Sequence, residues 1–88
     1  MRRLAAVLVL TAISGAAFAG PNCTSEPKHK WISEGEIKAK AAALGYQYKI
    51  FKVTPGNCYE IYGQDKSGQR IEVYFHPMTG AVVEEHKS

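Results

Sequence analysis

Hydrophobic residues follow three different patterns along the chain, and each pattern predicts a different element. A largely apolar run, residues 4–13, comes first. Between Ile32 and Leu44 the apolar residues recur at helical spacing. After Gly45, apolar and polar residues alternate in short segments, which is typical of half-buried strands. The pattern therefore predicts a leader, then one helix, then a sheet.

The apolar run has the features of a secretory signal peptide. Arg2 and Arg3 precede it, and it ends in small residues with an Ala17-Phe18-Ala19 cleavage motif. About ten apolar residues are too few for a bilayer core, which needs roughly 20; a retained membrane anchor is the alternative. We expect a Sec-type signal cleaved after Ala19, a periplasmic or secreted protein without a stable membrane anchor, and a single domain over residues 20–88.

Removal of the leader changes the charge of the protein. The whole chain carries 11 Lys and Arg against 8 Asp and Glu, which gives a net charge of +3. Without Arg2 and Arg3, residues 20–88 have a net charge of only +1. Because nucleic-acid binding needs clustered Lys and Arg, no nucleic acid is expected as a partner.

Cys23 and Cys58 are the two cysteines of the chain, and both follow the predicted cleavage site. An even pair in an exported protein indicates a disulfide. A redox or metal pair is the alternative, but the Cys-x-x-Cys spacing of such pairs is absent. We expect a structural disulfide that ties the irregular lead-in, residues 20–32, to the sheet.

Residues 33–44 are predicted to form an amphipathic helix, because both of its ends are specified. Ser33 and Glu36 make a capping box, in which the Ser33 hydroxyl accepts from the Glu36 N–H. Gly45 supplies the left-handed residue that ends many helices. The apolar stripe of this helix consists of Ile37, Ala41 and Leu44.

The rest of the chain predicts an antiparallel meander of three to four strands over residues 46–85, with turn residues between the strands. The expected strands are 46–54, with a bulge near Ile50-Phe51, then 58–63, 70–75 and 81–83, followed by a charged tail. One apolar sheet face needs cover, and the helix can provide it. The predicted fold is therefore α+β: one N-terminal helix on an antiparallel meander, with one disulfide.

The order of several short motifs resembles the PepSY family in its short, exported, single-domain form. The motifs are Cys23 with the lead-in to Trp31, Ser33-x-x-Glu36-Ile37 with Gly45-Tyr46, Cys58-Tyr59-Glu60-Ile61, Asp65-x-x-Gly68 before Arg70-x-Glu72, and Pro77-x-Thr79-Gly80. The usual Asp of the family before the last motif is His76 here, and we expect His to bond the turn backbone less readily.

The resemblance implies a non-catalytic module that binds and regulates or restrains a protein partner, with a peptidase as the partner that the family name suggests. The alternative is an accessory protein of a periplasmic electron-transfer, haem or metal system, with a membrane or redox protein as its partner. The oligomeric state is left open. The family has no catalytic motif that can be carried onto residues of this chain.

The residues themselves agree that no enzyme is expected. Residues 20–88 have no Gly-x-Ser-x-Gly motif and no paired histidines at helical spacing. We expect no cofactor and no metal, and solvated positions for His29 and His86. A metal site that joins His29, His76 and a carboxylate is the alternative.

Five residues are candidate partner contacts. Glu60, Tyr62, Glu72 and Tyr74 fall in the strand phase that faces away from the predicted core, and exposed Tyr is favoured at interfaces. The alternative is an ordinary solvated face, with Arg70 or Lys66 as loose ion-pair partners. Trp31 either anchors the lead-in or enters a pocket of the partner.

The last predicted strand is a second candidate surface. Val82 and Val83 leave an edge that a partner strand could extend, and the charged tail after them would protect that edge.

Overall fold

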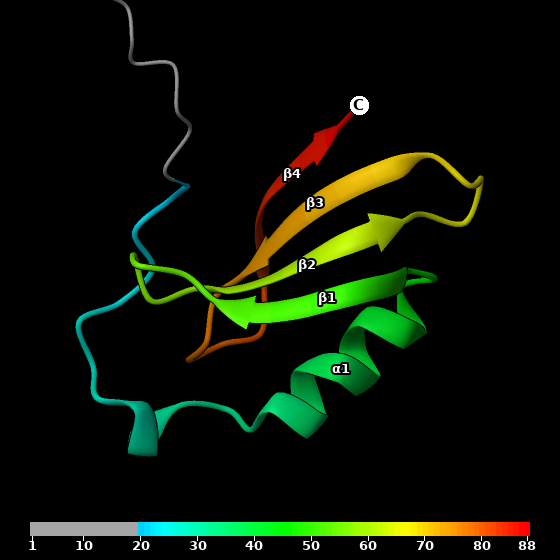
Figure 1. Ribbon diagram of the computed structural model, residues 1–88. Helices are drawn as coiled ribbons and strands as arrows, with labels where there is room; N and C mark the ends of the chain where they lie inside the picture. The colour runs from blue at the N-terminus through cyan, green and yellow to red at the C-terminus, as the bar shows by residue number, and fades with distance from the viewer. Residues whose placement is uncertain (1–19) are drawn as a thin grey trace, which may run out of the picture.

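The computed structural model describes residues 20–88; the predicted signal peptide lies outside the described residues. Its elements are a short 3-10 helix η1 (Lys28–Lys30), helix α1 (Glu34–Ala43) and strands β1 (Gln47–Val53), β2 (Tyr59–Gln64), β3 (Arg70–Phe75) and β4 (Val82–Lys87). The strands form one antiparallel sheet in the order β1-β2-β3-β4, and α1 lies under one of its faces (Figure 1).

The predicted α+β class is confirmed, with a four-stranded antiparallel meander and one disulfide. The helix spans Glu34–Ala43, close to the predicted 33–44, but because it follows the lead-in and η1 it is not clearly the N-terminal element of the fold. Among residues 20–88, no helix is long and apolar enough to cross a membrane.

Both ends of α1 follow from local chemistry. The Ser33 hydroxyl accepts a hydrogen bond of 3.1 Å from the backbone N–H of Glu36, and Gly45 has a φ of +90°. Ile37 and Ala41 are buried, but Leu44 is 48% exposed. The predicted stripe is wrong at Leu44, because this residue is the C-cap, where the chain turns from the helix into β1.

The strands differ from the prediction in two places. The bulge of β1 lies between Tyr48 and Ile50, slightly earlier than expected, and Gly63 of β2 pairs with Tyr48 there. A Cβ at Gly63 would lie only 2.5 Å from the Tyr48 Cα, so this close approach requires glycine. The residues after Val83, which we predicted to be a charged tail, form a strand. β4 continues to Lys87, because its backbone pairs with β3 along that length.

The core lies between α1 and the sheet. Its buried residues from the strands are Tyr59, Ile61, Ile71, Val73 and Phe75, which meet Ile37 and Ala41 of the helix. Trp31 packs edge-on against Tyr59 with ring centroids 5.4 Å apart, and its indole N–H donates to the Glu26 carbonyl at 2.9 Å. Trp31 therefore anchors the lead-in to the core, which was the first of the two roles that we considered for it.

The lead-in connects the two sides of the sheet. It begins on the face away from α1 and passes round the end of the sheet near the β1–β2 turn before it reaches η1 (Figure 1). The Cys23–Cys58 disulfide fastens it there, with the Cα atoms 5.2 Å apart. The Cys23 N–H also donates to the Gly56 carbonyl at 2.8 Å. The disulfide thus holds a segment that has little regular structure of its own.

Candidate functional site

The four predicted contact residues of the strands share the sheet face away from α1, which we call the outer face. Glu60 of β2 pairs directly with Tyr74 of β3, and Tyr62 pairs with Glu72. Successive side chains of a strand point to opposite faces, so these two pairs lie side by side. The predicted grouping of the four residues is confirmed, whereas their role in partner binding stays a prediction.

Two of these residues are not exposed as we predicted. Glu60 is 2% and Tyr74 is 3% exposed, while Tyr62 and Glu72 are half-buried. For Tyr74 the physical reason is the lead-in, because a Cβ at Gly20 would lie 2.9 Å from the Tyr74 ring. Glu60 lies between its two paired neighbours, Lys52 of β1 and Tyr74 of β3. The position of the cysteines could have indicated that the lead-in lies on this part of the outer face. Cys58 is two residues before Glu60, and its disulfide brings the residues near Cys23 close to β2 at that point.

Glu60 carries a buried carboxyl group with incomplete partners. Its nearest cation is Lys52, with 3.9 Å between Lys52 Nζ and Oε1, and not Arg70 or Lys66 as we expected. Within the described part of the chain, Oε2 has no hydrogen-bond partner. Burial raises the pKa of Glu60, although hydrogen bonding to Tyr74 and the charge of Lys52 oppose this shift.

The two tyrosines remain protonated phenols over the whole physiological pH range. A hydrogen bond with Glu72, together with burial, raises the pKa of Tyr62 to about 12. Burial, then the hydrogen bond with Glu60, raises the pKa of Tyr74 as well. Lys52 Nζ lies 5.1 Å from the Tyr62 ring centroid, a cation–π contact. Tyr62 therefore presents an aromatic ring and a fixed hydroxyl on the outer face.

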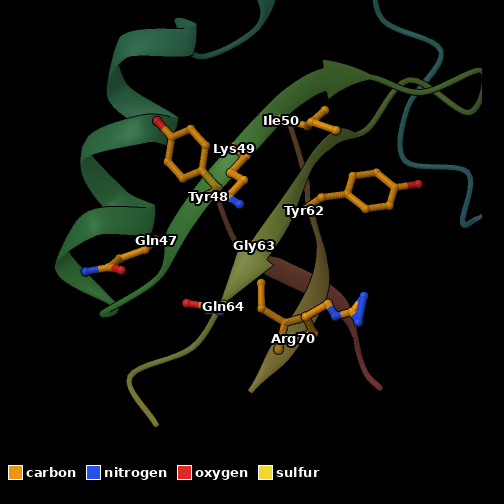
Figure 2. A pocket seen from close by; sticks show the side chains of 9 residues that line it. Gln47, Tyr48, Lys49, Ile50, Tyr62, Gly63, Gln64 and Arg70 are labelled. Carbon is orange, nitrogen blue, oxygen red and sulfur yellow. The ribbon is translucent and has the colours of Figure 1, made fainter. Parts of the chain in front are cut away.

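A hollow of about 510 Å³ opens beside Tyr62, at the end of the sheet far from the disulfide. Figure 2 shows Ile50, Tyr62 and Arg70 projecting from three neighbouring strands away from the helix, whereas Tyr48 points towards it. The residues that line the hollow are Gln47, Tyr48, Lys49, Ile50, Tyr62, Gly63, Gln64, Arg70 and Ile71.

The lining combines apolar surface with positive charge. Ile50 is 50% exposed, although it is a large apolar residue. Lys49 and Arg70 are exposed, and neither forms an ion pair with another described residue. Of these lining residues, sequence reasoning had singled out only Tyr62 as a partner contact. The bulge of β1 between Tyr48 and Ile50 sets the register in which Ile50 lies opposite Tyr62.

The three histidines lie in different segments of the fold. His29 is exposed in η1, and His86 contacts the Glu84 carboxylate at 2.9 Å. The Nδ1 of His76 accepts from the Met78 N–H at 3.1 Å, so His does bond the turn backbone here. Over residues 20–88, no group of three or more His, Cys, Asp and Glu is placed to hold a metal ion.

The edge of β4 is the second predicted surface. Val82 and Val83 are 40% and 43% exposed, as an unpaired edge strand allows. On the helix side of the sheet, the Tyr46 hydroxyl donates to the Glu85 carboxylate at 3.0 Å and so connects β4 to the end of α1. The charged second half of β4 is therefore held by a side-chain hydrogen bond, and among the residues of β4 the exposed apolar side chains are those of its first two, Val82 and Val83.

No curated protein and no solved structure matches the chain. The family model described as "Peptidase propeptide and YPEB domain" matches residues 3–86. Modules of this family are generally non-catalytic and resemble peptidase propeptides or inhibitors. Over almost its whole length, then, the chain is a member of the PepSY_2 family.

Proposed function

We propose that the protein is an exported, non-catalytic module that binds and restrains a secreted peptidase through the open end of its outer face. The observation that carries the proposal is the hollow at that end, whose lining combines exposed Ile50 and half-buried Tyr62 with the cations Lys49 and Arg70. Exposed apolar surface beside a Tyr ring is typical of protein contact surfaces.

The family supports the choice of a peptidase, because PepSY domains often interact with peptidases and are typically exported. The fold supports a rigid binding surface. The outer face is backed by a core in which Ile61, Val73 and Phe75 are fully buried. A partner would therefore meet a preformed surface, which lowers the entropic cost of binding.

Site-specific photo-crosslinking tests the proposal in cells that express the full chain. One variant carries a benzoylphenylalanine at position 50, beside the hollow. Its matched control carries the same residue at Ala42, which is exposed on α1 on the opposite side of the sheet. We expect position 50 to capture a peptidase that position 42 does not capture, and we expect the purified protein to slow cleavage of a fluorogenic peptide by that enzyme.

Two results would overturn the proposal. The first is the same set of captured proteins at both positions. The second is a captured peptidase whose activity is unchanged when a molar excess of the purified protein is added.

A further inference from the structure

The charges of the outer face are separated along the strands. Glu60 lies towards the disulfide end, where the lead-in covers the face, and Glu72 lies near the middle beside Tyr62. At the opposite, open end lie Arg70, which pairs with Gln64 at the last rung of β2 and β3, and Lys49, which occupies the bulge of β1 and lines the same hollow. A ligand at the open end therefore meets exposed cations, whereas the carboxyl group of Glu60 at the other end is buried and has Lys52 beside it.

The separation persists because local ion pairing does not cancel it at the open end. Lys52 approaches Glu60, and Tyr62 hydrogen-bonds Glu72, so the acidic groups have partners. Lys49 and Arg70 have no carboxylate of residues 20–88 within ion-pair distance. Two cations therefore flank an apolar surface without a counter-charge.

We propose that the hollow binds a short, extended segment of the partner in which a carboxylate adjoins a large apolar side chain. The apolar side chain would lie on Ile50 and the Tyr62 ring, and the carboxylate would pair with Arg70 and Lys49. A guanidinium can hold a carboxylate through two parallel hydrogen bonds, which also fixes its orientation. This inference rests on the proposed function and adds the chemistry of the segment that is recognised.

The shape of the site supports a short segment. A hollow of about 510 Å³ is in the range of small-ligand sites, roughly 300–1,000 Å³, and suits a few residues of peptide. Gly20 against Tyr74 closes the face on the disulfide side, so the segment cannot extend that way along the strands. Glu72 would repel a second carboxylate near Tyr62, and the acidic group must therefore point to the open end.

Fluorescence anisotropy with a defined probe tests the inference. The probe is a labelled, acetylated eight-residue peptide in which Asp alternates with Leu, and the control peptide has Lys in place of Asp. The protein is purified from cells that express the full chain. We expect the Asp–Leu peptide to bind and the Lys–Leu peptide not to bind, and we expect NMR shift changes at Ile50, Gly63 and Arg70.

Variants separate the role of charge from that of the fold. Arg70→Gln and Lys49→Gln should each weaken binding of the Asp–Leu peptide about tenfold. The matched control is Lys40→Gln, an exposed lysine of α1 on the other side of the sheet, which should leave the affinity unchanged. Melting temperatures within the scatter of the wild type would show that the loss is not unfolding.

Three outcomes would overturn the inference. Equal binding of both peptides is one, and NMR shift changes at Val82 and Val83 in place of the hollow are another. The third is haemin binding that Arg70→Gln abolishes while the peptide does not bind, since a tetrapyrrole would then be the carboxylate ligand. If position 50 still captures a peptidase in any of these cases, the proposed function stands and only the recognised chemistry is wrong.

Discussion

Loss of the disulfide should cost this protein a large part of its stability. The bridge joins residues separated by 35 positions. In the chain-entropy model, closing a loop of that length restricts the unfolded chain by about 4 kcal/mol at room temperature. The double variant Cys23→Ala/Cys58→Ala removes the bridge without leaving a free thiol. For a domain of this size, each kcal/mol moves the melting temperature by roughly 4–8 °C, so we expect a fall of about 15–30 °C.

The assay is thermal unfolding followed by far-UV circular dichroism, with urea unfolding for the free energy. Ser25→Ala is a control in the same lead-in, because Ser25 is exposed, and its effect should stay within about 0.5 kcal/mol. A loss below about 1 kcal/mol in the double variant would refute the reasoning. It would mean that the unfolded chain is already compact, or that the contacts of the lead-in hold without the bridge.

Three further predictions concern single side chains. Because burial raises the pKa of Glu60, its contribution to stability is fully present below the ordinary Glu pKa and is lost as the pH rises through the raised pKa. The free energy of unfolding, measured in urea, should therefore rise for Glu60→Gln relative to wild type as the pH increases from the ordinary Glu pKa to the raised pKa of Glu60. A difference that stays constant from pH 4 to 8 would contradict this. Gly63→Ala should lower the free energy of unfolding by more than about 2 kcal/mol, because the new Cβ meets the backbone of β1. Gly68→Ala should lower it by only about 1 kcal/mol, because a Cβ there meets open space and the cost comes from the φ of +86°. Equal losses in urea unfolding would refute the close approach at Gly63. The Tyr46 hydroxyl donates to Glu85, and burial together with this hydrogen bond raises the pKa of Tyr46 to about 12. Tyr46→Phe should therefore remove one late-titrating phenol from the ultraviolet pH titration of the protein. Loss of an ordinary phenol, which titrates near pH 10, would contradict the contact.

Much of the fold could be predicted because its signals are local. Ser33 and Gly45 mark the ends of the helix through one hydrogen bond and one left-handed residue. The turns after β1, β2 and β3 carry Pro, Gly, Asn or Asp, and the strands between them alternate as half-buried strands do. None of these features depends on residues far away in the chain.

The errors arose where distant segments decide the outcome. Alternation placed Glu60 and Tyr74 on the outer face, but it does not show that Gly20 of the lead-in covers the Tyr74 ring. The residues after Val83 are polar on their own, and they form a strand because β3 offers a free edge. The hollow requires the bulge of β1 to lie opposite Gly63, a register that alternation of side chains does not fix.

The substitution of His for Asp before the last turn shows a different limit. We expected His76 to serve the turn less well, yet its Nδ1 accepts from the Met78 N–H as an Asp oxygen would. A ring nitrogen two bonds from Cβ reaches the same donor as a carboxylate oxygen in that position. The turn therefore needs an acceptor at this distance from the backbone, and not a negative charge.

The disulfide and the proposed binding site are linked through the lead-in. The bridge keeps Gly20 on Tyr74, and this contact closes the disulfide end of the outer face while the end with Lys49 and Arg70 stays open. If the lead-in detached, the disulfide end of the outer face would be uncovered, and Glu60, which is now 2% exposed, would become more accessible to a ligand. A carboxylate of an acidic segment that reached this end would then be repelled by the carboxyl group of Glu60. On the proposed mode of binding, the bridge would therefore act beyond stability, because it keeps the acidic end of the face covered while the end with the cations stays open.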